Sequence, residues 1–184
     1  MHKKKLLKHF QFIDDLNIDC IQLNIKNLSV IYRNYTSKIN TKKIIEVKKF
    51  CKKNKISFYL SNNIKESIKL DLDGVYLPSF NKRPIIYKSA LKKKFEIIGS
   101  AHNLKEIKEK KEQGCTSIFL SPIFKTLKSK KFLGINKFNL LKLNKKGNFV
   151  MLGGMNKSNL KKIKMLNING VAGISFYKKK PAFN

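Results

Sequence analysis

The chain has 184 residues, of which 42% are hydrophobic and 13 are phenylalanine; this is enough to bury the core of one domain and excludes a disordered protein. Its formal net charge of +30 and isoelectric point near 10.1 raise the question of a nucleic-acid partner. Only Arg33 and Arg83 are arginine, however, and the remaining 39 of the 41 basic residues are lysines spread over every segment. Base recognition and bidentate phosphate contacts favour arginine. We therefore attribute the charge to A/T-rich codon usage and a solvated lysine surface, and expect no nucleic-acid partner.

The cysteines and the N-terminal segment indicate the compartment. Cys20, Cys51 and Cys115 have no C-x-x-C spacing, and the last two fall in apolar helical patterns, which predicts buried thiols under reducing conditions. Residues 1–7 are charged and contain no apolar stretch of signal-peptide length. No run approaches the roughly 20 apolar residues that a membrane helix needs. We expect a cytoplasmic protein without a membrane partner, and a homo-oligomer is left open.

Short apolar runs alternate with helical patterns along the whole chain, which predicts a single domain over residues 1–184. Helix-period apolar spacing marks residues 41–54, 103–113 and 156–166. Eight strands alternating with helices predict a compact α/β (β/α)8 TIM barrel with shortened first and last helices, and an open doubly wound sheet is the alternative. The predicted strands cover residues 9–14, 29–33, 56–60, 73–77, 95–99, 117–121, 148–152 and 170–174.

Local signals define the ends of the helix predicted at residues 103–113. Asn103 followed three residues later by Glu106 is typical of an N-cap with an acidic N3 residue. Gly114 stands where a left-handed residue ends a helix. The sequence therefore predicts where this helix begins and where it ends.

Five motifs in the second part of the chain occur in a fixed order. They are Asp73-Gly-Val-Tyr-Leu77, Ile98-Gly-Ser-Ala-His102, Leu120-Ser-Pro-Ile-Phe-Lys-Thr126, Leu152-Gly-Gly-Met155 and Gly170-Val-Ala-Gly-Ile-Ser175. In these motifs the chain resembles, from about residue 56 to residue 176, the thiamine phosphate synthase/TenI family, which is a (β/α)8 barrel. In the synthase, a pyrimidine diphosphate loses pyrophosphate, and the nitrogen of thiazole phosphate captures the resulting cation.

The resemblance implies a phosphate site after the last two strands, where barrels of this kind hold phosphate. It places thiazole phosphate on Gly153 and Gly154 and on the loop from Gly173 to Ser175. Thr126 and the lysine run that includes Lys128 and Lys130 would face the pyrophosphate or the substrate. Only Arg33 remains of the family's Gln-x-Arg-x-Lys motif. The alternatives are tight turns for the glycines and an exposed loop for the lysines.

Two positions depart from the synthase pattern. The carboxylates that hold Mg²⁺ in the family correspond to Asn62 and Asn81 in this chain. Mg²⁺ favours anionic oxygen ligands, so the substitutions argue against the cofactor that the resemblance implies. Asp14 or Asp15, after the first strand, is the nearby acidic alternative. The metal ligands are therefore left unassigned.

His102 favours the other branch of the family. TenI-like sequences carry a histidine at the matching position, and TenI isomerises a thiazole without a metal, by proton transfer. Imidazole suits that chemistry, and Ser100, two residues earlier and also just beyond the predicted strand at residues 95–99, is a further catalytic candidate, as are Lys128 and Lys130. We expect a thiamine-biosynthesis protein that binds thiazole phosphate and leans to the TenI-like role. The alternatives are the synthase and a non-catalytic phosphate-ligand binding protein, and helix capping is the other interpretation of His102.

Overall fold

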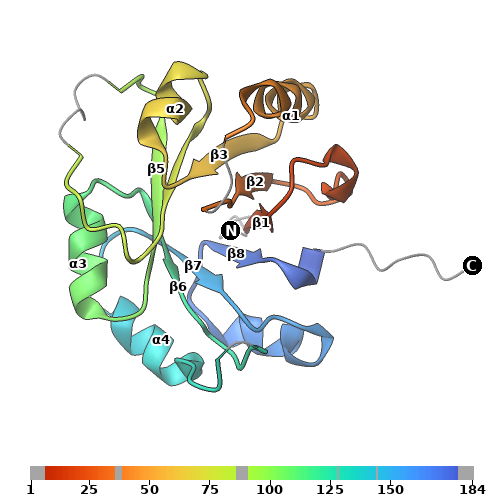
Figure 1. Cartoon of the computed structure of the whole chain (residues 1–184). Helices are drawn as coiled ribbons and strands as arrows, with labels where there is room; N and C mark the ends of the chain where they lie inside the picture. The colour runs from red at the N-terminus through yellow and green to blue at the C-terminus, as the bar shows by residue number, and fades with distance from the viewer. Residues whose placement is uncertain (1–6, 36–38, 86–90, 128, 144, 178–184) are drawn as a thin grey trace, which may run out of the picture.

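The computed structural model describes residues 7–35, 39–85, 91–127, 129–143 and 145–177. Eight parallel strands form a closed barrel in chain order, and β1 pairs with both β2 and β8 (Figure 1). This confirms the predicted barrel and excludes the open sheet. The strands are β1 (Lys8–Ile13), β2 (Leu28–Tyr32), β3 (Ser57–Ser61), β4 (Gly74–Leu77), β5 (Glu96–Ala101), β6 (Ser117–Leu120), β7 (Asn148–Leu152) and β8 (Gly170–Gly173).

The connections between strands are uneven in length. The first contains a single 3-10 turn, Ile18–Cys20, and another, Ser175–Tyr177, follows β8, which agrees with the predicted shortening at both ends. The helix predicted at residues 156–166 is a 3-10 helix, Lys157–Met165. The α-helices are α1 (Thr41–Lys53), α2 (Ile64–Lys69), α3 (Leu104–Glu112) and α4 (Gly134–Lys142), of which α2 and α4 were not predicted.

The barrel interior is filled by aromatic side chains. The ring of Phe119 lies 4.8 Å from that of Phe10, 5.5 Å from that of Tyr76 and 6.2 Å from that of Phe12, each in an edge-on arrangement. Side chains alternate between the two faces of a strand, so every second residue points inward. The interior cluster consists of Phe10, Phe12, Ile31, Tyr59, Tyr76, Ile98, Phe119, Val150 and Ala172.

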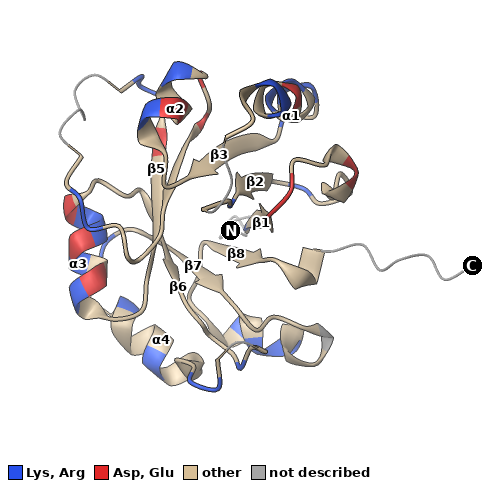
Figure 2. Ribbon diagram, viewed as in Figure 1, with Lys and Arg blue, Asp and Glu red and all other residues tan. Residues whose placement is uncertain are grey.

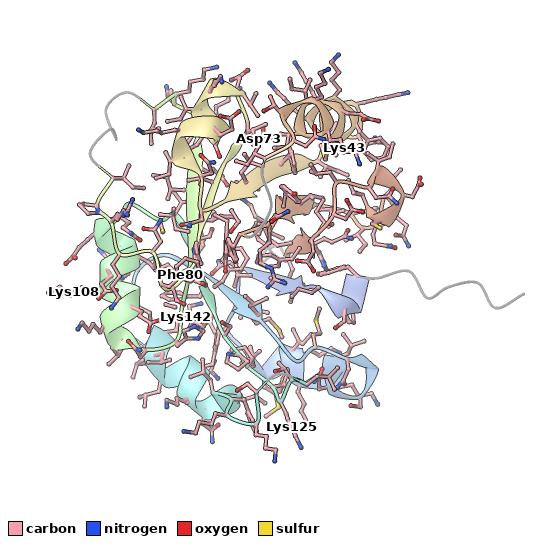
Figure 3. The ribbon with its side chains drawn as sticks, in the orientation of Figure 1. Lys43, Asp73, Phe80, Lys108, Lys125 and Lys142 are labelled. Atoms are coloured by element: carbon pink, nitrogen blue, oxygen red, sulfur yellow. The ribbon has the colours of Figure 1, made fainter. Side chains whose placement is uncertain are left out.

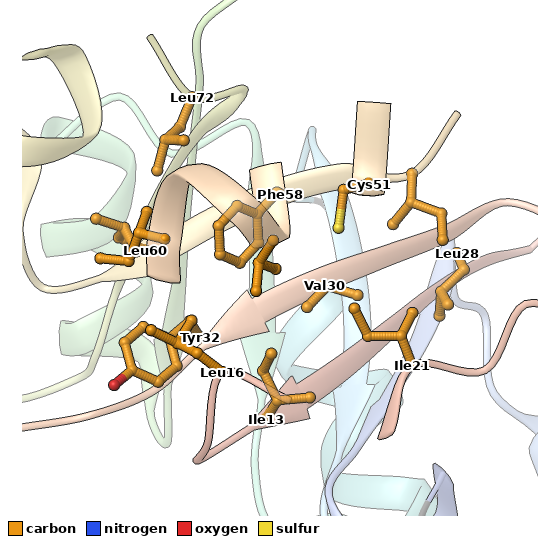
Figure 4. Close-up of a cluster of buried hydrophobic side chains, with 13 residues drawn as sticks. Ile13, Leu16, Ile21, Leu28, Val30, Tyr32, Cys51, Phe58, Leu60 and Leu72 are labelled. Atoms are coloured by element: carbon orange, nitrogen blue, oxygen red, sulfur yellow. The ribbon is translucent and has the colours of Figure 1, made fainter. Parts of the chain in front are cut away.

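The opposite faces of the strands pack against the helices. Ile44, Val47 and Cys51 of α1 are buried against β1–β3, as Figure 4 shows for Cys51. Burial raises the pKa of the Cys51 thiol to about 12, so the thiol is unreactive at neutral pH. Charged residues lie mainly on the outer helices (Figure 2), and no helix among the described residues is long and apolar enough to cross a membrane.

The predicted ends of α3 are confirmed. The Asn103 side chain accepts a hydrogen bond from the backbone N–H of Glu106 at 3.0 Å and donates one to the Glu106 carboxylate at 2.8 Å. Gly114 has a φ of +83°, as the helix end requires. These local contacts fix where α3 begins and ends. The helix packs against β5 and carries Lys110, which contacts the site described below.

Phe119→Ala tests the importance of the interior packing. Because Phe119 is fully buried and contacts three rings, its truncation should lower the free energy of unfolding by about 3–5 kcal/mol. Urea unfolding measures this change. Phe132→Ala removes the same side chain from an exposed position and should cost less than about 1 kcal/mol. Equal costs for the two variants would contradict a core centred on Phe119.

Candidate functional site

The carboxyl ends of the eight strands lie on one side of the barrel and, with the loops that follow them, form the C-terminal rim. A pocket of about 340 Å³ opens there. In Figure 3 the labelled Phe80, which lines this pocket, lies toward the middle of the view, whereas Lys108 and Lys125 point outward. The pocket is lined by Asn62, Phe80, Asn81, Lys82 and Arg83.

Asn62 and Asn81, predicted as ligand positions, come together in this pocket. Asn62 directly follows β3 in a left-handed conformation, with a φ of +60°, which asparagine tolerates better than most residues. The Asn81 side-chain N–H2 donates to the Asn62 side-chain oxygen at 2.7 Å, and the Asn81 oxygen accepts from the backbone N–H of Arg83 at 3.0 Å. The two amides therefore form one hydrogen-bonded pair.

Arg33 lies at the rim beside the first strand. Its Nε and Nη2 atoms both donate to Oδ1 of Asp14, at 3.2 and 3.0 Å, and its guanidinium carbon lies 5.8 Å from the centre of the Phe12 ring. Both side chains remain partly exposed. Asp14, an acidic alternative for a metal, is thus paired with an arginine, and Asp15 is exposed.

Two aromatic residues that the sequence did not single out stand next to the amide pair. The rings of Tyr35 and Phe80 lie 5.4 Å apart edge to face, and the Tyr35 hydroxyl forms a 2.8 Å hydrogen bond with Ser61. Burial raises the pKa of the Tyr35 hydroxyl, which therefore stays protonated at neutral pH. Phe80 is 61% exposed, so the pair presents an apolar wall to the rim.

His102 connects three loops of the rim. The carbonyl oxygen of Ser121 lies 2.6 Å from Nδ1 and can only accept, so Nδ1 carries a proton. Nε2 lies 3.1 Å from the Ser79 hydroxyl, and the His102 backbone N–H donates to Glu106 at 2.8 Å. Asn103, and not the His102 side chain, caps α3, whereas the unprotonated Nε2 of a neutral imidazole would direct its lone pair toward Ser79.

The other proposed catalytic residues occupy different environments. Ser100 is buried inside the barrel, where it hydrogen-bonds Tyr76. Lys130 is exposed on the loop after β6. Lys128 lies outside the described residues, so the structure does not place it. Among the described residues, no hydrogen bond joins Ser100 or Lys130 to His102.

The predicted phosphate loops lie side by side at the ends of β6, β7 and β8. The backbone N–H of Phe124 donates to the carbonyl of Gly153, and Thr126 Oγ1 accepts from the backbone N–H of Ser129 at 2.9 Å. A Cβ at Gly154 would lie 2.4 Å from the Phe124 carbonyl oxygen. Gly173 is the last residue of β8, Ser175 follows it, and β8 pairs directly with β7. The structure thus brings Thr126 close to Gly153, just after β7, and places the loop after β8 at the neighbouring strand end.

Two residues that were not predicted, Lys110 of α3 and its C-cap residue Gln113, lie behind the pocket. Lys110 is fully buried, and its ammonium donates to the Asn81 carbonyl at 2.6 Å and to the Gln113 side-chain oxygen at 2.8 Å. Burial lowers its pKa. The available signal was the helical spacing, because Lys110 stands three residues after the buried Ile107. Lys82 and Arg83 were missed because no strand or motif marked their loop.

The donor set of the pocket does not fit Mg²⁺. Both amide oxygens of the Asn62–Asn81 pair already accept hydrogen bonds, and Asp14 is bound to Arg33. Within the described ranges, no group of three or more His, Cys, Asp or Glu side chains is arranged to hold a metal ion. Mg²⁺ needs anionic oxygens in octahedral geometry, which neutral, occupied amides do not provide.

Gly154→Ala tests the contact between the β6 and β7 loops. Gly154 and Gly134 have almost the same φ, +74° and +71°, but only a Cβ at Gly154 would collide with backbone. Gly134→Ala should therefore cost about 1 kcal/mol of strain, and Gly154→Ala at least about 1 kcal/mol more. Thermal or urea unfolding compares them. Equal costs would mean that the β6 loop moves freely away from Gly154.

Comparisons with known proteins agree with this architecture. A family model described as thiamine monophosphate synthase (TMP-TENI) matches residues 3–176. A thiamine-phosphate synthase of Prochlorococcus marinus is 36% identical over 134 residues, which is 71% of this chain. Another, from Prochlorococcus marinus subsp. pastoris, is 30% identical over 154 residues, which is 82% of this chain. The chain spans only 38% and 44% of the lengths of these two relatives.

A solved structure shares the fold. The thiamine phosphate pyrophosphorylase of Pyrococcus furiosus superposes with a TM-score of 0.73 at 20% identity, over 93% of this chain and 86% of that one. The match of the family model over nearly the whole chain and the shared barrel confirm the resemblance found in the motifs. This chain belongs to the thiamine monophosphate synthase (TMP-TENI) family of thiamine biosynthesis.

Proposed function

We propose that the protein joins a pyrimidine diphosphate to thiazole phosphate, forming thiamine phosphate and releasing pyrophosphate. The main support is that the relatives above bear the name thiamine-phosphate synthase. These names favour the synthase, which the sequence analysis gave as an alternative, over the TenI-like role that it preferred. The convergence of Arg33, Asn62, Asn81, Thr126 and Gly154 on one rim is consistent with a two-substrate site.

The chemistry requires a site that holds two anionic substrates and separates charge. The bond between carbon and the diphosphate oxygen breaks, and the electron pair leaves with pyrophosphate. The lone pair of the thiazole nitrogen then forms the new bond to that carbon. We assign thiazole phosphate to the loops at Gly153–Gly154 and Gly173–Ser175, beside Thr126, because adjacent strands deliver them to one place.

The apolar wall fits the pyrimidine. Tyr35 and Phe80 present an aromatic edge and face next to the pocket, and Phe80 is more than half exposed. Flat heteroaromatic rings gain both buried area and favourable ring contacts on such surfaces. With the pyrimidine there, its diphosphate would reach the adjacent pocket lined by Asn62, Asn81 and Arg83. Arg33, held by Asp14, then contributes positive charge from the neighbouring strand end.

Thiazole isomerisation is the second candidate, and one observation favours it. His102 has Nδ1 fixed by a backbone carbonyl, and this arrangement directs the lone pair of Nε2 toward Ser79 at the rim. An imidazole oriented in this way can accept a proton at Nε2. The third candidate is a non-catalytic protein that binds its ligand at the same phosphate loops. It would make the same contacts with thiazole phosphate but would catalyse no reaction.

Purified protein incubated with both substrates distinguishes the candidates. The synthase proposal expects thiamine phosphate and pyrophosphate in equal amounts. His102→Asn removes the base but keeps an N–H2 group for the Ser121 carbonyl, so synthase turnover should stay within about tenfold of the unsubstituted protein.

The matched control is Ser79→Ala, which removes the hydroxyl partner and leaves the imidazole in place. Thiazole isomerisation that falls about 10²–10⁴-fold in His102→Asn but not in Ser79→Ala, without thiamine phosphate formation, would establish the isomerase instead. Binding of thiazole phosphate without either reaction would leave the non-catalytic candidate.

A further inference from the structure

We infer that the pocket lined by Asn62, Asn81, Lys82 and Arg83 binds a diphosphate or other phosphoryl anion directly, without a divalent metal. The inference rests on the proposed function only in naming pyrophosphate as the natural anion. It arises from the disagreement between the metal that the family implies and the groups that this pocket presents. Three independent features support it: the orientation of the amides, the charge of the lining residues and the buried ammonium behind them.

The amide pair offers donors to the pocket. The backbone N–H of Arg83 can only donate, so the Asn81 atom that it contacts at 3.0 Å is the oxygen. The other Asn81 atom is therefore the N–H2 group, and its partner on Asn62 is the oxygen. Both oxygens thus accept hydrogen bonds within the protein, whereas the Asn62 N–H2 group and one Asn81 N–H have no hydrogen-bond acceptor among the residues that the structure describes. These donors suit an anion and not a cation.

The charges of the lining residues are positive. Lys82 and Arg83 both border the pocket, and none of the ion pairs between described residues includes either of them. Arg83 is one of only two arginines in a chain with 39 lysines. A guanidinium supplies paired donors in the geometry that phosphate oxygens need. The side chains that line the pocket therefore carry positive charge and no carboxylate.

A buried ammonium reinforces this charge from behind. The Lys110 ammonium donates to the Asn81 carbonyl, and Gln113 donates to the Asn81 and Arg83 carbonyls at 3.0 and 2.8 Å. The hydrogen-bond partners of Lys110 are neutral oxygens, those of Asn81 and Gln113. Glu106 and Glu109 of the same helix act on its charge, but none of the ion pairs between described residues includes it. Inside the protein, a positive charge acts over a longer range than in water. It raises the cost of placing Mg²⁺ beside Asn81 and favours an anion there.

The same contacts make Lys110 a positioning residue. Together with Gln113 it holds the backbone of Asn81 and Arg83, and therefore the loop that presents the pocket's cations. Space for its stem comes from Gly99 of β5, where a Cβ would lie 2.9 Å from Lys110 Cδ. The Lys110 side chain therefore occupies the space that a side chain at position 99 would need. Such close packing is expected of a lysine with a structural role and not of a surface lysine.

Calorimetric titration of the unsubstituted protein with inorganic pyrophosphate, in EDTA and then in excess MgCl2, tests the inference. Binding in EDTA should be at least as tight as in Mg²⁺. Arg83→Gln should weaken it roughly ten- to hundredfold, because a charged hydrogen-bond donor is lost. Lys108→Gln, which removes an exposed charge from the same helix as Lys110, should change it less than about twofold.

A second variant tests the amides directly. Asn62→Asp with Asn81→Asp restores two carboxylates, so binding in EDTA should fall at least about tenfold and Mg²⁺ should restore it. Unfolding curves verify that the variants fold. The inference is overturned if pyrophosphate binds only with Mg²⁺, if it does not bind at all, or if Arg83→Gln and Lys108→Gln weaken it equally.

The result for pyrophosphate binding can be distinguished from the result for the proposed synthase activity. Metal-free, Arg83-dependent binding without thiamine phosphate formation would refute the synthase proposal and leave this inference standing. Thiamine phosphate formation that requires Mg²⁺, with no pyrophosphate binding in EDTA, would refute the inference and leave the synthase proposal standing.

Discussion

The pairing of β1 with β8 is the constraint on which the rest of the structure depends. Lys8 lies opposite Gly170 in this pairing, and a Cβ at Gly170 would come within 2.7 Å of the Lys8 carbonyl oxygen, so the closure needs a residue without a side chain. Once the sheet closes with all strands parallel, every carboxyl end lies on the same rim. Residues as far apart in the sequence as Arg33 and Ser175 thereby lie on one rim.

In the closed barrel, lysines occupy two different environments, the solvent-exposed surface and the interior behind the pocket. Many of the described lysines lie on the outer helices, where the charge is solvated and individual ion pairs contribute little. Lys110 differs because it is buried and donates to neutral oxygens behind the pocket. A buried charge acts on its neighbours with little screening, so this one residue influences the pocket more than the exposed lysines do.

Family membership and pocket chemistry give different information about this protein. The barrel and the order of the rim loops agree with the thiamine monophosphate synthase family. The amide pair departs from the metal site that the family implies, and the departure is accompanied by Arg83, Lys82 and the Lys110–Gln113 contacts. A change from carboxylates to amides inside an electropositive pocket alters which ions the pocket prefers while leaving the fold intact. Fold and chemistry can therefore diverge within one family.

The sequence by itself determined the barrel, its eight strands and the ends of α3, because these depend on local patterns: buried apolar runs, helical spacing and a cap formed within four residues. The short α2 and the helix α4 escaped prediction, since six residues in one and a glycine start in the other provide weak periodicity. Motif order also directed attention to Asn62 and Asn81, which lie together in one pocket, while their role in binding stays a prediction.

Only the tertiary structure decided what that pocket contains. The pairing of Asp14 with Arg33, the pairing of Asn62 with Asn81 and the contact of the buried Lys110 with Asn81 all join residues 19 to 29 positions apart. Helical spacing from Ile107 places Lys110 on the inward side of α3, but nothing in the sequence shows that its ammonium would find partners there. Lys110 is buried because Gly99 leaves space for its stem and the loop after β4 offers carbonyl oxygens to its ammonium.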